Sequence, residues 1–61
     1  MKNYRYEIIN TGTSEVLDRC NDFSEANMIA HDYMKSDKIN TAVIDTTTNK
    51  AVSSCTKSKG L

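Results

Sequence analysis

Three side chains of this 61-residue chain have the chemistry of a nucleophile or a soft metal ligand: Cys20, His31 and Cys55. Zinc sites are built from closely spaced pairs such as CxxC or HxxxH, and the sequence contains neither. A Cys/His catalytic pair also needs a third group that orients the histidine. Since His31 falls on the polar side of a predicted helix and both cysteines fall at the ends of predicted strands, we expect no catalytic residue, no metal site and no cofactor.

Carboxylates are the other side chains that could do acid/base chemistry. Five of them lie in the middle of the chain: Asp18, Asp22, Glu25, Asp32 and Asp37. A surface that mimics DNA needs a strong net negative charge, but the chain has 8 acidic and 8 basic side chains and a formal net charge of zero. Because lysine and arginine are interspersed among the acids, the pattern predicts a solvated face rather than a catalytic pair.

Length and composition limit the class of protein. A chain of 61 residues forms one domain with a thin core, predicted at residues 1–56 and followed by a short flexible basic tail at 57–61. Without a membrane-length apolar run or a secretory signal, and with only two cysteines, the chain is expected to be cytoplasmic and to contact no membrane. Asn, Lys, Ile and Tyr supply 20 residues, a bias typical of AT-rich genomes such as those of phages and low-GC bacteria.

A repeated segment organises the sequence. IINTGTSEVLDRC (residues 8–20) returns 35 residues later as VIDTTTNKAVSSC (residues 43–55). Four of the thirteen positions are identical: Ile9 and Ile44, Thr11 and Thr46, Thr13 and Thr48, Cys20 and Cys55. Average residue usage gives roughly one identity by chance, although any two hairpins from a chain rich in Ile and Thr would look alike. Both interpretations predict two strands joined by a four-residue loop in each copy.

Polar residues at the centre of each copy indicate how the two hairpins turn. Asn10 and Asp45 can accept a hydrogen bond from the backbone two residues later, as Asx-turns. Asn49 tolerates the left-handed conformation that such loops often require. Ser14 occupies the equivalent place in the first copy, so we expect Gly12 to supply the flexible position there instead.

An apolar stripe between the hairpins predicts one helix. Its members follow the spacing i, i+3, i+4, i+7 and i+8: Ala26, Ile29, Ala30, Tyr33 and Met34. This spacing places all of them on one side of a helix. Ser24 is the predicted N-cap, and Glu25 suits the positive end of the helix dipole. The helix should run from about residue 25 to about residue 36.

The predicted order is strand, strand, helix, strand, strand, an α+β fold in which one helix packs on a four-stranded antiparallel sheet. Pairing of the first and third strands in the middle gives the sheet order 2-1-3-4. The two hairpins of this ββαββ sandwich are then related by pseudo-two-fold symmetry. Cys20 and Cys55 would lie on opposite edge strands, too far apart for a disulfide, and should be free thiols.

Side chains alternate along a strand, so parity assigns each residue to a face of the sheet. The face beneath the helix is predicted to hold Tyr4, Tyr6, Ile8, Leu17, Val43 and Val52. The opposite, open face is predicted to hold Arg5, Glu7, Ile9, Val16, Asp18, Cys20, Ala42, Ile44, Ala51, Ser53 and Cys55. An apolar group rimmed by polar side chains on an uncovered sheet is typical of an association surface. Such residues also occur in strands for their β-propensity alone.

The first functional hypothesis is a small non-enzymatic protein-binding module, an adaptor or inhibitor of the kind that a phage genome encodes. Its predicted partner-binding residues are Ile9, Val16, Ile44 and Ala51, with Arg5 and Glu7 at the rim. An edge strand is the other route to a partner, because residues 51–56 have short side chains and no proline. The partner is expected to be another protein, a second copy in a homodimer, or both.

Two alternatives remain open. A single-stranded nucleic-acid-binding module would use Tyr4, Tyr6, Arg5, Lys2 and the basic tail at residues 57–59, since exposed aromatic rings on a sheet stack on bases. Zero net charge removes the long-range attraction to phosphate and counts against this hypothesis. An obligate homodimer with a purely structural role is the second alternative.

Overall fold

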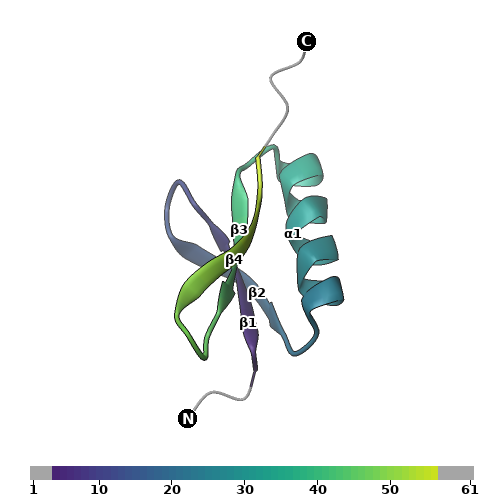
Figure 1. Ribbon diagram of the computed structural model, residues 1–61. Coiled ribbons are helices and arrows are strands. Elements are labelled where there is room, and N and C mark those ends of the chain that lie inside the picture. Colours follow the sequence, from purple (N-terminus) through teal and green to yellow (C-terminus); the bar gives the residue numbers. More distant parts are fainter. Residues whose placement is uncertain (1–3, 57–61) are drawn as a thin grey trace.

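The computed structural model describes residues 4–56, which form two β-hairpins separated by one helix. The elements are β1 (Tyr6–Asn10), β2 (Glu15–Cys20), α1 (Phe23–Asp37), β3 (Thr41–Asp45) and β4 (Lys50–Cys55). The strands form one antiparallel sheet in the order β2-β1-β3-β4, and α1 lies against one face of it (Figure 1). The predicted ββαββ sandwich and its strand order are confirmed. The tail predicted at residues 57–61 lies outside the described residues. Among residues 4–56, no helix is long and apolar enough to cross a membrane.

Helix α1 begins at Phe23, before the start that the sequence predicts. Its N-cap is Asp22, whose backbone is extended and whose Oδ2 accepts a hydrogen bond from the Glu25 amide at 3.1 Å. Ser24 was the wrong choice because the aspartate two residues earlier already satisfies this free N–H group of the first turn. The helix ends at Asp37, and Lys38 after it is the C-cap, in the left-handed conformation with φ 56°.

The core between α1 and the sheet is small. Ile8, Val43 and Thr41 are its largest fully buried side chains, and α1 contributes the buried Ala26 and Ala30. Because alanine is short, α1 approaches the sheet closely, and the Thr41 hydroxyl donates a hydrogen bond to the Ala30 carbonyl oxygen at 2.8 Å. The other members of the predicted helical stripe are half-buried: Ile29, Tyr33 and Met34.

The two hairpins turn in the same way. The Asn10 Oδ1 atom accepts a hydrogen bond from the Gly12 amide, and the Asp45 Oδ1 atom accepts one from the Thr47 amide, each at 2.8 Å. Both predicted Asx-turns are therefore confirmed. Both loops contain the four residues that the sequence predicts, 11–14 and 46–49.

Each loop ends on a residue in the left-handed conformation, Ser14 with φ 65° and Asn49 with φ 61°. The prediction for Asn49 is confirmed. The prediction that Gly12 would take this role in the first loop was wrong, since Gly12 does not adopt a left-handed φ. The Ser14 and Asn49 amides each donate a 2.6 Å hydrogen bond to the carbonyl four residues earlier, so the closed loop fixes the position of the left-handed residue in both copies.

One extra residue in each hairpin shifts the alternation of side chains between the two faces. Ile8 pairs with Asp18 and Ile9 pairs with Val16, which leaves Leu17 as a β-bulge. Val52 is the equivalent bulge of the second hairpin. Beyond a bulge, side chains point to the face opposite to the one that simple alternation predicts.

Four residues were assigned to the wrong face because of these bulges: Asp18, Cys20, Ser53 and Cys55. The structure places them on the side of α1. Cys20 and Cys55 pack against the core, and the Ser53 hydroxyl donates a hydrogen bond to Asn27 Oδ1 at 2.8 Å. Asp18 faces α1 across a groove described below.

The two-fold symmetry that relates the hairpins does not extend to α1, because the described chain has one helix. As a result, α1 covers the two bulges unequally. Leu17 packs against the core, and the Tyr33 hydroxyl donates to its carbonyl oxygen at 3.4 Å. Val52, predicted to lie in the core, is 45% exposed. Tyr6, Ile8, Leu17 and Val43 do lie beneath α1 as predicted. Among residues 4–56, the fold therefore leaves the Val52 bulge exposed and places no element over the sheet face opposite α1.

Candidate protein-binding surface

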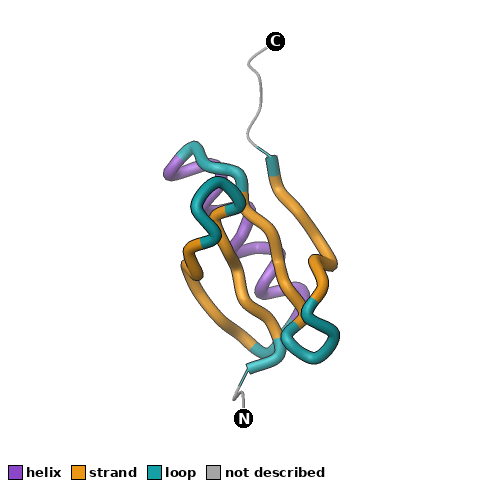
Figure 2. The backbone as a smooth tube through the Cα atoms, turned by 90° about the vertical axis from the view of Figure 1, so that its left-hand side faces the viewer, coloured by secondary structure: helices purple, strands orange, loops and turns teal. Residues whose placement is uncertain are grey.

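The open face of the sheet carries a continuous apolar strip from one hairpin to the other, which we call the apolar band. Its members are Ile9, Val16, Ala42, Ile44 and Ala51. Strand register makes them neighbours: Ile9 pairs with both Val16 and Ala42, and Ile44 pairs with Ala51. Figure 2 shows this face turned towards the viewer, with α1 behind the sheet. The structure therefore brings the four predicted apolar partner-binding residues together.

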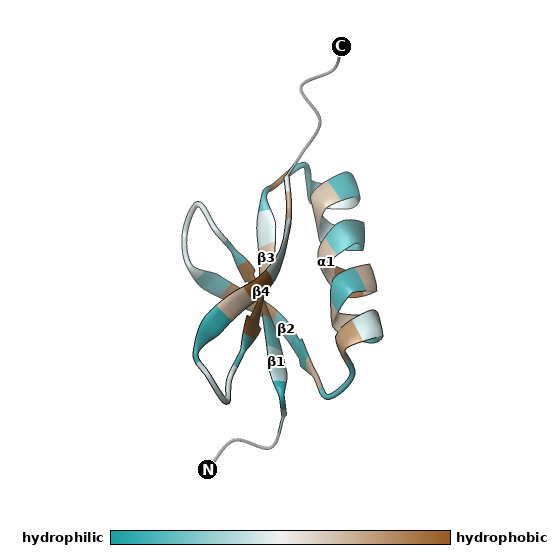
Figure 3. Ribbon diagram, viewed as in Figure 1, coloured by the Kyte–Doolittle hydropathy of each residue, from teal (hydrophilic) through white to brown (hydrophobic). Residues whose placement is uncertain are grey.

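The band is accessible at its ends and more closely packed at its centre. Val16 is 36% exposed and Ala51 is exposed, whereas Ile9 and Ile44 are half-buried. Ala42 is only 4% exposed because its short side chain lies between larger neighbours on the central strands. In Figure 3 the most hydrophobic segments gather where the strands cross at the centre of the sheet.

Both hairpin loops project from the side of the sheet that faces away from α1 (Figure 1). The bulges at Leu17 and Val52 account for this shape, because a bulge bends its strand and increases the local twist. Strand register places the loops at opposite corners of the open face, with the apolar band between them. The open face is therefore flanked by two polar tips rich in threonine.

Charged side chains at the rim of the band are already paired. Glu7 lies next to Ile44, and its carboxylate is 3.7 Å from Arg19 on the neighbouring strand. The Arg19 guanidinium also lies 5.0 Å from the centre of the Tyr4 ring. Sequence parity placed Tyr4 in the core, but Tyr4 lies before β1 and its ring contacts this cation instead.

Arg5, the sixth predicted partner-binding residue, is held by Asp45. The guanidinium donates to both carboxylate oxygens at 3.3 Å, and Asp45 is 6% exposed. These hydrogen bonds, with the Thr47 amide, lower the pKa of the Asp45 carboxyl, and the same pair raises the pKa of Arg5. Arg5 thus fixes the start of β1 to the second hairpin, and its charge is balanced within the chain.

The two aromatic residues of the nucleic-acid hypothesis differ in their surroundings. Tyr6 packs against the core and makes an edge-to-face contact with Phe23, with ring centroids 5.7 Å apart. Its ring is therefore not displayed on the open face. Tyr4 is half-buried beside Arg19. Lys2 and residues 57–59 lie outside the described residues.

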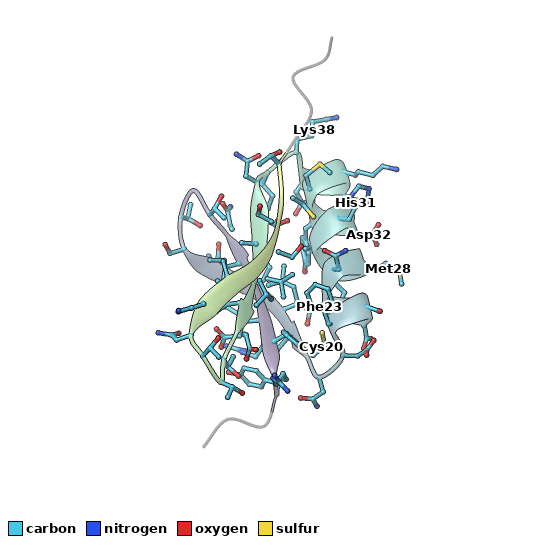
Figure 4. The ribbon with its side chains drawn as sticks, viewed as in Figure 1. Cys20, Phe23, Met28, His31, Asp32 and Lys38 are labelled. Atoms are coloured by element: carbon cyan, nitrogen blue, oxygen red, sulfur yellow. The ribbon has the colours of Figure 1, made fainter. Side chains whose placement is uncertain are left out.

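The residues considered for catalysis or metal binding are not brought together. Cys20 and Cys55 are free and half-buried on opposite edge strands, whereas His31 is exposed on the side of α1 that faces away from the sheet (Figure 4). The Cys20 thiol donates to the Asp22 carbonyl oxygen at 3.4 Å, and burial raises its pKa. Among residues 4–56, no group of three or more His, Cys, Asp or Glu side chains could hold a metal ion.

An open groove of about 330 Å³ lies between α1 and β2. It is lined by Asp18, Ile29, Asp32, Tyr33, Ser36 and Asp37. Sequence parity missed this groove because it turned Asp18 to the open face, and only the bulge at Leu17 returns Asp18 to the helix side. The open face likewise gains Arg19 and Ser54, which parity had not placed there.

Comparison with known proteins adds no relative to this description. No family model, no characterised protein and no solved structure matches the chain.

Proposed function

We propose that this protein is a small non-enzymatic protein-binding module that associates through the open face of its sheet. The observation that supports the proposal is the apolar band, five adjacent aliphatic side chains on a face that no element of the described chain covers. Uncovered apolar strips with a paired polar rim are characteristic of association surfaces. A phage-encoded adaptor or inhibitor would use such a face to occupy a surface of its partner.

The band has the anatomy that a binding centre requires. Ile9 and Ile44 are already half-buried by their neighbours, so covering them costs less side-chain entropy than ordering fully exposed side chains would. The rim charges Glu7 and Arg19 pair with each other, 3.7 Å apart. A partner that covers the apolar centre would therefore not separate a buried charge from its counter-charge.

Substitution of the two central isoleucines tests the proposal. Ile9→Asp and Ile44→Asp place a carboxylate in the centre of the band, and we expect each to abolish retention of the partner when the tagged protein is purified from its native host. Met28→Asp is the matched control, because Met28 is 67% exposed on the outer side of α1 (Figure 4). Circular dichroism checks that all three variants fold. Unchanged retention by a folded Ile9→Asp, Ile44→Asp double variant would refute the proposal.

Nucleic-acid binding is the competing hypothesis, and it has less support. Its stacking residue Tyr6 is engaged with Phe23 and the core, and the chain has no net charge. We expect no change in the fluorescence anisotropy of labelled single strands at low salt, where phosphate contacts are strongest. Binding in the tens-of-micromolar range that falls steeply with salt would favour this hypothesis instead.

A further inference from the structure

We infer that the partner which covers the apolar band is a second copy of this chain, packed face to face. This inference rests on the proposed function and names the occupant of the same surface. Three features of the structure support it: the size of the core, the charge balance of the open face, and the shape that the two loops give to that face.

The core is small, so an isolated domain would have a low free energy of unfolding. Ile8, Val43 and Thr41 are the largest fully buried side chains among residues 4–56. Domains of this size usually gain stability from disulfides, a structural metal or oligomerisation. The two cysteines are free, and no metal-binding group occurs among residues 4–56. Covering the apolar band with a second copy would give each chain a second apolar layer.

The open face is self-complementary in charge. A face that binds its own copy must not carry a net charge, because two identical charged faces repel each other. The charged side chains of Glu7 and Arg19 at this face pair with each other at 3.7 Å, whereas Asp45 alternates with Ile44 along β3 and pairs with Arg5 on the other side of the sheet. Within residues 4–56 the charges of the open face therefore balance on both copies, and a second copy would cover the Glu7–Arg19 ion pair together.

The loops determine how two such faces fit. They stand at two opposite corners, and the other two corners carry Arg19 and Ser54 and have no loop among residues 4–56. A two-fold axis that lies in the plane of the interface and runs parallel to the strands places each loop over a partner corner that has no loop among residues 4–56, with the strands of the two sheets nearly aligned. Ile9 and Ile44 of both copies then meet at the centre.

The area of the face explains why the loops must take part. Four strands of five or six residues present roughly 350 Å² in plan. Two such faces give roughly 700 Å², below the approximately 1,000 Å² of a specific interface. Both loops project on the side of the sheet that faces away from α1 (Figure 1), so in a face-to-face dimer their contacts with the partner's loop-free corners would add the missing area. A flat partner surface would meet the two projecting loops before it reached the apolar band between them.

The mass of the wild-type protein in solution is the primary test and needs no variant. We expect light scattering coupled to size exclusion to show a species of twice the 6.8 kDa chain mass. The thermal midpoint should rise with protein concentration, because folding and association are coupled by mass action. A monomer with a concentration-independent midpoint up to millimolar chain would overturn the inference. The proposed function would survive that result if a different protein were still lost on Ile9→Asp substitution.

Two variants then locate the interface. Ile44→Asp should weaken dimerisation by at least about a hundredfold, because each dimer loses two buried aliphatic side chains and gains two carboxylates at its centre. Val52→Lys should leave the dimer intact, since Val52 is exposed on edge strand β4 outside the band. A dimer that resists Ile44→Asp but dissociates on Val52→Lys would show pairing through the β4 edge. That outcome would overturn both this inference and the proposed role of the open face.

Discussion

Ile8 and Val43 pair across the two central strands, 35 residues apart in the sequence, and both are 0% exposed. The two-fold axis that relates the hairpins passes between them, because a shift of 35 residues exchanges the pairs on either side: the pair of Tyr6 and Asp45 becomes the pair of Thr41 and Asn10. Asn10 corresponds to Asp45, Ser14 to Asn49, and Leu17 to Val52. The repeat in the sequence thus specifies a symmetric sheet, and residues at equivalent positions act as internal controls for one another.

The pair on the axis should dominate the stability of the protein. Replacement of Ile8 by alanine removes a fully buried aliphatic side chain and leaves a cavity, at a cost of about 2–5 kcal/mol in the free energy of unfolding. Met28→Ala, at a 67% exposed position, should change it by less than about 0.5 kcal/mol. Urea denaturation measures both values. Equal losses in the two variants would show that the core lies elsewhere.

Strand order and turn chemistry could be predicted from the sequence because local signals determine them. Asn10 and Asp45 favour Asx-turns through their own side chains, and a single amphipathic helix must cover one face of the sheet. The bulges could not be predicted in this way. A bulge inserts one residue without a distinctive residue type, and neither Leu17 nor Val52 differs from an ordinary strand residue. Only the tertiary register shows them.

Simple alternation assigned the residues on the loop side of each bulge to the correct face of the sheet. Ile9 and Ile44 lie on the unbulged strands, and Val16 and Ala51 precede the bulges, so simple alternation held for all four. It failed for Cys20 and its equivalents beyond the bulges. The pairing of Arg5 with Asp45 was missed for a different reason: the two residues lie 40 positions apart, and no local pattern links them.

The left-handed residue of each loop provides a matched test of turn strain. Ser14 with φ 65° and Asn49 with φ 61° occupy equivalent positions. Glycine adopts this conformation without the steric cost that a Cβ atom imposes, whereas asparagine tolerates it better than serine does. We expect Ser14→Gly to raise the free energy of unfolding by up to about 1 kcal/mol and Asn49→Gly to raise it less. A larger gain at residue 49 would contradict this account.

Cys20 should react slowly with alkylating agents. Burial raises the pKa of its thiol above the ordinary value of 9.0, and the negative charge of Glu25 acts in the same direction. Because the thiolate is the reactive form, we expect iodoacetamide to modify Cys20 more slowly in the folded Cys55→Ser variant than in the same variant unfolded in urea. Mass spectrometry follows the rate as a function of pH. A midpoint below 9.0 in the folded protein would contradict the burial of this thiol.

The ion pair between Arg5 and Asp45 should make stability depend on pH in the acid range. Hydrogen bonds from Arg5 and the Thr47 amide to the ionised carboxylate lower the pKa of Asp45 from its ordinary value of 3.8. A carboxyl group whose pKa is lowered in the folded state stabilises the fold fully above its unfolded pKa, and the stabilisation is lost as the pH falls through the folded pKa. The free energy of unfolding should therefore decline below pH 3.8 in the wild type.

Asp45→Asn separates this ionic contribution from the turn itself. Asparagine already accepts the equivalent hydrogen bond at Asn10, from the Gly12 amide at 2.8 Å, so the substitution should keep the Asx-turn and remove only the charge. We expect the variant to be less stable than the wild type at neutral pH and the difference to shrink as the pH falls below 3.8. Guanidinium denaturation would screen the ion pair, so urea is the denaturant of choice. A difference that stays constant from neutral pH to about pH 2 would mean that Arg5 does not stabilise the ionised form of Asp45.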